Sequence, residues 1–422
     1  MSDFEIDRRD FLKGAMAGAV LLLTAEGLQA AEAGKAEEEK PIPGPPVAIG
    51  VIGLGTWGNK LVTTYSKMPS AKVAALCDTY ESAVTRARKT AADAATFTDY
   101  RKLLESKDIE AVIVATPSHL HKQIALDAIA AGKHVYCEAP LAVTVEDAKA
   151  IAAAGKGSSK VFQVGLQGRS NLLYKHVEKF VRAGALGKPA SAYAQSNKRQ
   201  SWRRMSPNAE REKEQNWRLS RSTSAGIIGE SSIHQLDLAN WFLNSLPTAV
   251  SGYGAIVEWN DGRDVPDTVQ CVVEYPNNLR MICVGTLANS FSADYTLFQG
   301  SYSSLAMREN RGWMIKEADS PLLGWEVYAR KETCFEETGI CMIADATKIL
   351  AQGKDPAKEG KVTPEKEPLY CALENFTRSI RENSKPACGA VEGYRAAVAA
   401  IKANEAVVSA SKVIFQKEWF EI

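Results

Sequence analysis

The sequence lacks an excess of charge of either sign. Its 422 residues carry 51 lysines and arginines against 50 aspartates and glutamates, so the net charge is close to zero. A protein that binds nucleic acid or an anionic membrane presents a basic surface, and this balance argues against both partners. Beyond its N-terminal segment the chain also lacks an apolar run long enough to span a bilayer, and it contains no internal repeat. We therefore expect a globular protein whose partner is a small molecule.

Cysteines in metal-binding spacing are missing as well. Eight cysteines are scattered without a C-x-x-C pair or a Cys/His cluster, so the sequence predicts no metal site. Cys271 and Cys283 lie symmetrically about a turn predicted at residues 276–278, where a hairpin would bring them opposite each other. Cross-strand disulfides are geometrically demanding, and we favour two free thiols over a disulfide. We expect most of the cysteines to be buried and reduced.

The N-terminal residues are expected to form an export signal rather than part of the fold. Arg8 and Arg9 precede an apolar stretch at residues 14–23, and small residues follow at 31–33. An arginine pair, a short apolar region and an A-x-A site are typical of twin-arginine signals, which carry folded proteins. We predict a signal peptide at residues 1–33 that the twin-arginine export machinery recognises, and a periplasmic protein without a stable membrane anchor. A general secretory signal or an uncleaved anchor is the alternative.

A charged, proline-rich linker follows at residues 34–46, and we expect it to pack against nothing. The rest of the chain is long enough for two domains with sizeable cores.

The glycine-rich stretch at residues 47–78 is the clearest motif. An apolar run at 47–52 is followed at once by Gly53-x-Gly55-x-x-Gly58 and by a segment that can form a helix. In a Rossmann unit the first glycine makes a tight turn and the second lets the backbone approach a pyrophosphate. The third lets the helix pack closely on the strand. This order of elements predicts a dinucleotide site.

Three further residues complete the motif. The helix N-terminus, with Thr56 and Trp57, offers free N–H groups to the phosphates. A second apolar run ends at Asp78, which would accept hydrogen bonds from the ribose hydroxyls. Because its carboxylate would repel a 2′-phosphate, we expect NAD rather than NADP as the cofactor.

The Rossmann pattern continues with strands expected at residues 111–115, 134–137 and 161–165. In open parallel sheets, ligands bind beyond the carboxyl ends of the strands. The residues that follow these strand ends are candidate cofactor contacts: Thr116, Pro117, His121 and Glu138. His121 also opens a predicted helix, so a structural role is an equal alternative.

From residue 189 the sequence becomes strand-rich. We expect strands at 190–195, 249–258, 268–275 and 279–287, separated by short polar turns typical of an antiparallel sheet. Between the first two lies a polar excursion that contains Trp202 and Arg203. Tryptophan beside arginine suits sugar binding, because ring faces pack on sugar rings and guanidinium binds hydroxyls. A solvated loop whose tryptophans pack on the domain is the alternative.

Glu230 and His234 lie four residues apart where a helix is expected to begin, so they would share one face. Asp237, three residues further on, could orient the imidazole. This spacing is compatible with a general acid or base, and also with a capped helix that contains a structural histidine.

These motifs together resemble the Gfo/Idh/MocA family, named for glucose–fructose oxidoreductase and inositol dehydrogenase. The resemblance rests on GLGTWG, Asp78, TPSHLH, GKHVYCEAPLA, QVGLQGR and GIIGESSIHQLDLANWF. It implies an α/β fold, with a Rossmann domain at 47–165 and an α+β domain with an open, mostly antiparallel sheet at 166–422. It also implies substrate contacts from Arg169 and Tyr174, and in many members a homo-oligomer. The catalytic role of His234 and Glu230 gains most of its weight from this resemblance.

One departure from the family pattern affects the chemistry. The family usually has Glu-Lys-Pro where this chain has Glu138-Ala139-Pro140, and that lysine assists proton removal. We therefore expect an NAD-dependent oxidoreductase for a sugar or sugar derivative, with His234 as general base or acid. A redox-neutral glycosidase or lyase, in which NAD is reduced and reoxidised within one cycle, is the second hypothesis. A cofactor-binding protein without turnover is the third.

Overall fold

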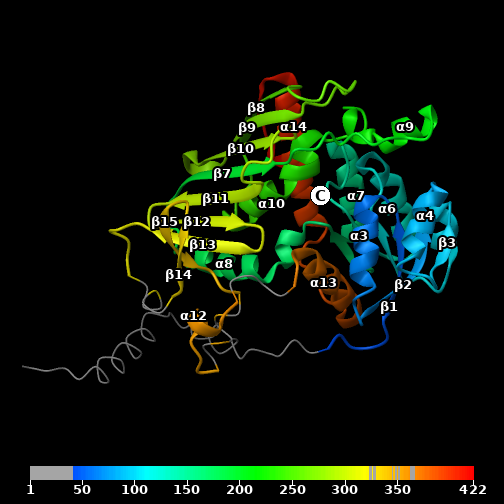
Figure 1. Ribbon diagram of the computed structural model, residues 1–422, viewed down its shortest axis with the longest axis horizontal. Coiled ribbons are helices and arrows are strands. Elements are labelled where there is room, and N and C mark those ends of the chain that lie inside the picture. Colours follow the sequence, from blue (N-terminus) through cyan, green and yellow to red (C-terminus); the bar gives the residue numbers. More distant parts are fainter. Residues whose placement is uncertain are drawn as a thin grey trace, which may run out of the picture.

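The computed structural model describes residues 41–322, 326, 329–344, 346, 349, 352–361 and 366–422. The predicted signal peptide and the first part of the linker lie outside the described residues. Two sheets with their helices lie next to each other along the long axis of the molecule (Figure 1). Within the described part of the chain, no helix combines the length and the apolar character needed to cross a membrane.

The first sheet has six parallel strands in the order β3-β2-β1-β4-β5-β6. Its central strands are short apolar runs that are buried on both faces, which is typical of parallel sheets. The strands are β1 (Val47–Ile52), β2 (Ala71–Cys77), β3 (Ala95–Phe97), β4 (Ala111–Val114), β5 (His134–Cys137) and β6 (Phe162–Val164). The connecting helices are α3 (Thr56–Tyr65), α4 (Glu81–Arg88), α5 (Tyr100–Glu105), α6 (His121–Ala130) and α7 (Val145–Gly157). The predicted Rossmann domain is confirmed, and its strand order reverses between β1 and β4, where dinucleotides bind.

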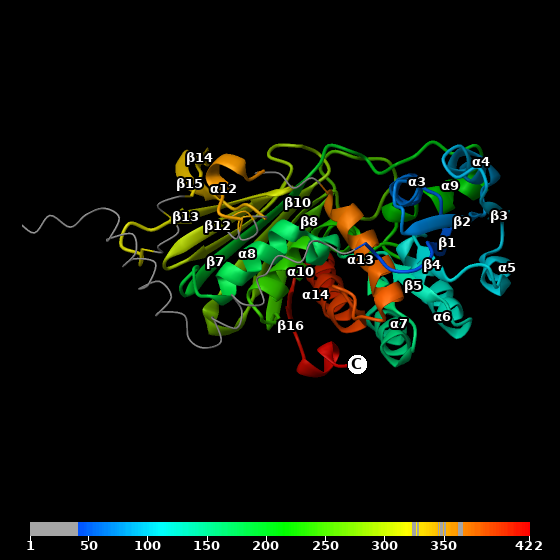
Figure 2. The same ribbon diagram turned by 90° about the horizontal axis from the view of Figure 1, so that it is seen from below.

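Two helices from the end of the chain complete this first core. On α13 (Pro368–Glu382), Phe376 packs edge-on against Tyr136 of β5, with ring centroids 5.7 Å apart. On α14 (Ala390–Ser409), Gly393 lies so close to β6 that a Cβ would be 2.3 Å from Val164 Cγ2. Because α14 also packs on the second sheet, it holds the two domains together (Figure 2).

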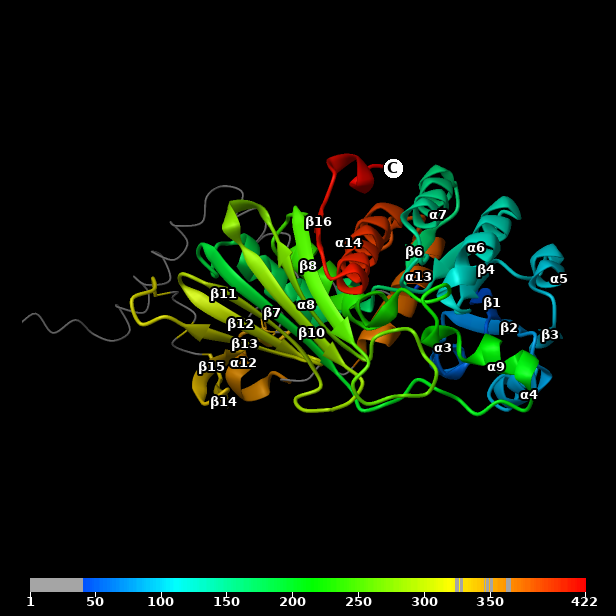
Figure 3. The same cartoon turned by 90° about the horizontal axis from the view of Figure 1, so that it is seen from above.

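The second sheet has ten strands in the order β14-β15-β13-β12-β11-β7-β10-β9-β8-β16. Among the described strand pairs of this sheet only β7–β10 is parallel, so the predicted mostly antiparallel sheet is confirmed. The strands are β7 (Pro189–Asn197), β8 (Ala249–Ala255), β9 (Thr268–Glu274), β10 (Arg280–Thr286), β11 (Asp294–Gly300), β12 (Ser303–Arg308), β13 (Arg311–Lys316), β14 (Lys331–Cys334), β15 (Glu337–Cys341) and β16 (Lys412–Ile414). The remaining helices are α8 (Leu172–Arg182), α9 (Ala209–Gln215), α10 (Ile233–Phe242) and α12 (Pro356–Glu359). Helices α8, α10 and α14 cover one face of the sheet (Figures 2 and 3).

The hairpin of β9 and β10 places the two symmetric cysteines opposite each other. Cys271 pairs with Cys283 in the register of the two strands, and both are buried free thiols. All eight cysteines are buried and none forms a disulfide within the described part of the chain, as expected for a chain that folds under reducing conditions.

One expectation about the linker is wrong. Its last residues do not extend freely, because Arg381 Nε on α13 donates a hydrogen bond to the Pro45 carbonyl at 2.8 Å. The same guanidinium binds both carboxylate oxygens of Glu110, at 2.7 and 2.9 Å, and thus fixes the entry of the chain into β1.

Candidate active site

The turn between β1 and α3 forms a phosphate cradle. Gly53 has a φ of +92°, and a Cβ there would lie 2.6 Å from the Ala115 carbonyl oxygen. A Cβ on Gly58 would lie 1.9 Å from the Gly53 carbonyl oxygen, so the helix and the turn touch. By contrast, no protein atom lies within 4 Å of the Cβ position of Gly55, which leaves its backbone open to the cleft. A pyrophosphate site requires this combination of a tightly packed turn and one glycine whose backbone the phosphates can approach.

The start of α3 adds to this cradle. The helix begins at Thr56, and Gly55 provides no side-chain cap. Both residues and Trp57 line the cleft, so the first N–H groups of the helix and the positive end of its dipole are available to an anion.

Asp78 follows β2 and lies at the edge of the cradle. Its Oδ2 accepts a hydrogen bond from Leu54 N at 2.7 Å, and its Oδ1 accepts one from Tyr80 N at 2.8 Å. These two bonds fix the carboxylate, while each oxygen keeps a second lone pair for a ribose hydroxyl. Cradle, helix start and fixed acid therefore fit a dinucleotide.

The ends of β4 and β5 form the inner wall of the cleft. Thr116, Pro117 and Glu138 line it, and Gln167 Nε2 donates to Glu138 Oε2 at 3.3 Å. Glu138 Oε1 has no hydrogen-bond partner among the described residues. Burial raises the pKa of Glu138 to about 7, although hydrogen bonds from the Trp57 side chain, the Ala139 backbone and Gln167 oppose the shift. This carboxyl is therefore divided between its two protonation states at neutral pH.

His121 lies between the turn after β4 and the turn after β5. Its Nδ1 lies 2.9 Å from the Pro140 carbonyl, and its Nε2 lies 2.9 Å from the Thr116 carbonyl. The ring is buried, and burial lowers its pKa to about 4 against the opposing effect of these carbonyls. Both ring nitrogens face backbone carbonyls, and the single N–H of the neutral ring can donate to one of them at a time. The geometry supports a structural role for His121 beside the cofactor.

Glu230 projects from the second domain onto the opposite wall. It lies in a π-helical turn, Ile228–Ser232, directly before α10. Its Oε2 accepts a hydrogen bond from the Ser118 hydroxyl at 3.2 Å and lies 3.5 Å from Arg218 Nε. Burial raises the pKa of this carboxyl, and Arg218 opposes that shift. Glu230 therefore links the Rossmann domain to the polar excursion.

His234 lies on the first turn of α10 and lines the same cleft. Its side chain is exposed to the cleft, yet so much protein surrounds it that its pKa is lowered to about 4. The imidazole is therefore neutral at pH 7 and can accept a proton.

Asp237 does not orient the imidazole of His234, and that expectation is corrected. Its oxygens accept three hydrogen bonds from Arg169, at 2.8, 2.8 and 3.0 Å, in a pair that is almost fully buried. The Arg169 guanidinium also lies 5.5 Å from the Trp241 ring centroid. Among the described residues, Asp237 makes its side-chain hydrogen bonds with Arg169 and none with His234.

Two other predicted substrate contacts lie outside the cleft lining. The Tyr174 hydroxyl donates to the Glu309 carbonyl at 3.3 Å, and the ring packs edge-on against Phe242. Arg203 forms an ion pair with Glu212 and donates to the Asp261 carbonyl at 2.6 Å. Trp202, by contrast, lines the cleft, where Arg218 lies 5.9 Å from its ring centroid.

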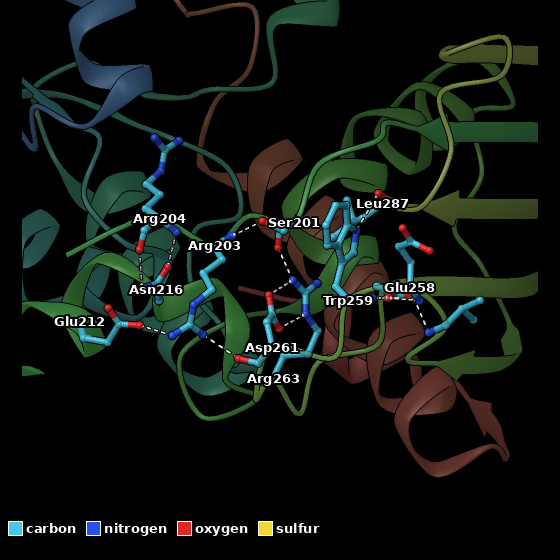
Figure 4. A network of polar contacts seen from close by, with 12 residues as sticks. Ser201, Arg203, Arg204, Glu212, Asn216, Glu258, Trp259, Asp261, Arg263 and Leu287 are labelled. Atoms are coloured by element: carbon cyan, nitrogen blue, oxygen red, sulfur yellow. Dashed lines mark hydrogen bonds and ion pairs between the residues drawn. The ribbon is translucent and has the colours of Figure 1, made fainter.

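The polar excursion is a fixed strap rather than a solvated loop; we call residues 198–224 the strap. Figure 4 shows the polar network that anchors it. The fully buried side chain of Arg263 binds Asp261 at 2.7 Å and the Ser201 carbonyl. The Asn216 amide group binds both backbone groups of Arg204, at 2.7 and 3.0 Å. The strap therefore holds Trp202, Trp217 and Arg218 in defined places on the cleft wall.

The cleft between the domains has a volume of about 1320 Å³, above the ~300–1,000 Å³ usual for ligand sites. It has room for a dinucleotide and a second small molecule. Its lining includes residues that the sequence analysis did not single out as site residues: Ser118, His119, Gln167, Lys198, Arg211, Trp217, Arg218 and Ser231. Half of these come from the strap, whose charged composition carries no periodic signal. Across the described residues, no group of three or more His, Cys, Asp or Glu side chains is arranged to hold a metal ion.

Relatives of known name share this architecture. A levoglucosan dehydrogenase of Pseudarthrobacter phenanthrenivorans is 31% identical over 206 residues, which are 46% of this chain and 50% of that protein. A 2,7-anhydro-N-acetylneuraminate hydratase of Mediterraneibacter gnavus is 24% identical over 261 residues, 61% of this chain and 66% of the relative. The chain thus spans between half and two thirds of these relatives. A solved levoglucosan dehydrogenase in complex with NADH and levoglucosan has the same fold, with a TM-score of 0.69 and 20% identity over 87% of this chain and 99% of that chain.

Two family profiles match in the order that the fold requires. Residues 47–166 match the oxidoreductase family with an NAD-binding Rossmann fold, and residues 174–303 match the GFO/IDH/MocA C-terminal domain. Together with the cradle, the acid after β2 and the mostly antiparallel second sheet, these matches show that the chain belongs to the GFO/IDH/MocA family of NAD(P)-dependent oxidoreductases.

Proposed function

We propose that this protein oxidises or reduces a sugar or sugar derivative with a tightly held NAD cofactor. One observation carries the proposal: the cradle around Gly55 and the His234–Glu230 pair, from different domains, line a single cleft. A cofactor bound along the cradle would leave the rest of the cleft to the substrate. The names of the relatives support a carbohydrate, because levoglucosan and anhydro-neuraminate are both sugar derivatives.

His234 is the proposed general base. Oxidation of a carbinol carbon removes a proton from its hydroxyl group and a hydride from its C–H bond, so a base must take the proton. Bound NAD would supply the hydride acceptor. The position that usually holds lysine is Ala139, which lines the cleft and cannot accept a proton. A neutral imidazole exposed to the cleft can do so at a ring nitrogen.

Glu230 is proposed to set the electrostatics around that base. It lies in the π-helical turn before α10, and its carboxylate is shared between Ser118 and Arg218. A buried carboxylate near the imidazole would favour the protonated ring that forms during oxidation. Trp202, Trp217 and Arg218 offer ring faces and a cation to a sugar, and Arg218 lies 4.4 Å from the Trp217 ring centroid.

NAD is proposed over NADP because Asp78, at the edge of the cradle, would face the adenosine ribose of a bound cofactor. Its carboxylate accepts hydrogen bonds from hydroxyl groups and repels a 2′-phosphate. Asp78→Ala should weaken NAD binding and reduce the preference for NAD over NADP, measured as dissociation constants by calorimetry. An unchanged preference would remove Asp78 from the ribose site.

A redox-neutral glycosidase or lyase is the second candidate. Oxidation of a ring hydroxyl makes the neighbouring C–H acidic, the leaving group is eliminated, and the hydride then returns to the product. The alanine at position 139 favours this candidate, since the usual dehydrogenase lysine is absent. A hydratase among the relatives supports it as well, because hydration involves no net oxidation.

One screen separates these functions. The purified protein is incubated with free sugars and with nitrophenyl glycosides while NADH absorbance and nitrophenol release are followed. Net NADH formation is expected for the dehydrogenase, and nitrophenol without net NADH would support the second candidate. Neither signal across a broad panel would favour a cofactor-binding protein without turnover.

Export through the twin-arginine route is also part of the proposal. Arg8 and Arg9 support it, and the route suits a protein that acquires its cofactor in the cytoplasm before crossing the membrane. Replacement of both arginines by lysine should retain the protein in the cytoplasm in cell fractionation. Periplasmic recovery of that variant would point to a general secretory signal.

The open face of the second sheet supports a homo-oligomer. Tyr193, Tyr295 and Phe335 form a row with ring centroids 5.4 and 5.5 Å apart, and Ile282 beside Tyr193 is exposed. An apolar row of this kind on a sheet surface is a candidate contact between subunits. Ile282→Lys should lower the mass measured by light scattering, and an unchanged mass would place the contact elsewhere.

A further inference from the structure

Arg211 crosses from the second domain to the ribose end of the Rossmann domain. It lies on α9, the short helix of the strap, and its side chain reaches the residues that follow β2. Its Nη1 donates to the Thr79 hydroxyl at 3.3 Å, and its Nη2 lies 3.7 Å from Asp78 Oδ1. Its guanidinium also stacks over Tyr80, 4.5 Å from the ring centroid. All three of these partners directly follow β2.

One nitrogen of this guanidinium lacks a hydrogen-bond partner among the described residues. The Arg211 side chain is 19% exposed, and its Nε is buried without a hydrogen-bond partner among the described residues. A buried unpaired donor is costly, and Arg211 nevertheless lies on the wall of the cofactor cleft. A further acceptor placed between Arg211 and Asp78 would complete the arrangement.

We propose that Arg211 is a cofactor-binding residue contributed by the second domain. It donates hydrogen bonds to the ribose oxygens whose hydroxyl protons Asp78 accepts, and it thereby closes the strap over the adenosine half of the cofactor. This inference rests on the proposed NAD cofactor and adds a residue and an element that hold it. Cofactor release then requires the strap to lift, which makes release slow.

The charges around Arg211 favour a ribose with free hydroxyl groups over a 2′-phosphate. Two carboxylates, Asp78 and Glu214, already face the one guanidinium, and Glu214 forms an ion pair with it. A phosphate dianion would have to displace or neutralise at least one of them. Arg211 should therefore strengthen the binding of NAD more than that of NADP.

The test measures cofactor release rather than turnover. The full chain is loaded with NADH, mixed with excess NAD in a stopped-flow instrument, and the loss of NADH fluorescence gives the release rate. Arg211→Met keeps the length of the stem but removes the hydrogen bonds. We expect it to raise the release rate by about 10- to 100-fold, the effect of losing charge-assisted hydrogen bonds. Lys213→Met is the matched control on the same helix, because Lys213 is exposed and lies outside the cleft lining; its release rate should stay within about twofold.

Two further measurements keep the test decisive. Thermal unfolding of the cofactor-free variants checks the fold, and Arg211→Lys, which keeps the charge but loses the planar fork, should release NADH at an intermediate rate. Equal release rates for Arg211→Met and Lys213→Met would overturn the proposal. An effect confined to NADPH would overturn it too, because Arg211 would then be a phosphate contact. If the unchanged protein bound neither cofactor, the proposed function itself would fail, which is a separate result.

Discussion

At the scale of single residues, burial changes the pKa values of two side chains that line the cleft. His234 and Glu138 line the same cleft, and the desolvation of their charged forms shifts their pKa values in opposite directions. The pKa of His234 falls to about 4, and that of Glu138 rises to about 7. The imidazole is therefore neutral at pH 7, while the carboxyl is present in both forms. Two groups with opposed shifts give the cleft a proton acceptor and a proton donor.

Catalysis should depend on His234 more than on any other residue of the cleft wall. His234→Ala should lower kcat by ~10²–10⁴, the usual contribution of a general base, because Ala139 cannot replace it. The dissociation constant of NAD should not change much, since His234 belongs neither to the phosphate cradle nor to the ribose end of the cleft around Asp78 and Arg211. Steady-state kinetics and calorimetry measure the two quantities.

His176→Gln serves as the control for this substitution, because His176 lies on α8 outside the cleft lining. Glu230→Gln should cost less than His234→Ala, as it changes the electrostatics without removing the base. A His234→Ala enzyme that keeps more than roughly a third of its kcat would assign the base to another group.

A second histidine, His134, should make the stability of the protein depend on pH. His134 Nδ1 accepts a hydrogen bond from Val161 N at 2.9 Å, which requires an unprotonated nitrogen, and burial lowers its pKa to about 4. In the unfolded chain the pKa of histidine is about 6.5, so as the pH falls the unfolded state takes up the proton first. The stabilising contribution is complete above pH ~6.5 and is lost as the pH falls toward ~4.

His134→Asn should reduce this loss, because the amide oxygen can accept the same hydrogen bond and does not titrate. Between pH 7 and pH 5 the unchanged protein should lose about 1 kcal/mol more unfolding free energy than the variant, roughly half the value of a fully buried group because solvent screens the partly exposed ring. Urea unfolding at both pH values measures the difference. Parallel curves for the two proteins would show that His134 does not carry this proton uptake.

At the scale of elements, two glycines of the turn between β1 and α3 have different roles. Gly58 is needed for the packing of the turn, and Gly55 is needed for cofactor binding. A Cβ on Gly58 would meet the backbone oxygen of Gly53 at 1.9 Å, whereas a Cβ on Gly55 would meet no protein atom. Gly58→Ala should therefore destabilise the protein by about 1–3 kcal/mol or more, because backbone atoms must move. With the cofactor removed from both proteins, Gly55→Ala should unfold at the same temperature as the unchanged protein.

For cofactor binding we expect Gly55→Ala, and not Gly58→Ala, to have the larger effect. Gly55→Ala places a methyl group where the pyrophosphate approaches, and we expect its NAD affinity to fall at least tenfold, about 1.4 kcal/mol. Calorimetry and thermal unfolding on both variants form one experiment, in which each glycine is the control for the other. A Gly55→Ala protein with normal NAD affinity would contradict the assignment of the cradle.

The strap shows how a polar segment becomes a fixed element without an apolar core of its own. The buried carboxylate of Asp267 accepts hydrogen bonds from the backbone of Val257, Glu258 and Trp259, at 2.8 to 2.9 Å. This fixes the loop after β8, and that loop in turn binds the strap through Asp261 and Arg263. Ion pairs buried in this way hold geometry even where they add little net stability.

At the scale of the whole molecule, the two domains enclose the cofactor cleft and cannot easily separate. Helix α14 packs on α7 of the first domain and on β8 of the second, and Glu230 is bound to Ser118 across the cleft. Closure of the strap over one end of the cleft adds a third connection. A cofactor bound there would be enclosed from several sides.

The purified protein should therefore carry its cofactor. We expect denaturation to release NAD(H), close to one molecule per chain, detected by liquid chromatography and mass spectrometry of the supernatant. The same protein with Gly55→Val should carry none and serves as the control. A supernatant free of NAD(H) and NADP(H) would argue against a retained cofactor, although weak binding could still be measured by calorimetry.

Much of the fold and of the cofactor site could be predicted from the sequence. The cradle depends on the order strand, Gly53, Gly55, Gly58, helix and Asp78, and all of these are neighbours along the chain. Local spacing fixes such a unit, because a buried parallel strand and a close helix tolerate few alternatives. For the same reason the β9–β10 hairpin placed Cys271 opposite Cys283 as expected.

The tertiary structure alone decided which distant side chains meet. The spacing along the helix suggested that Asp237 contacts His234. In the folded protein the Asp237 carboxylate is bound by Arg169, which comes from another segment. Likewise, no periodicity connects Arg211 with Asp78, or Arg218 with Glu230, because the strap is a charged run that is positioned by ion pairs from other loops. Spacing along the chain determines a local backbone motif, whereas the partner of a buried charge is whichever opposite charge the folded chain brings within about 4 Å.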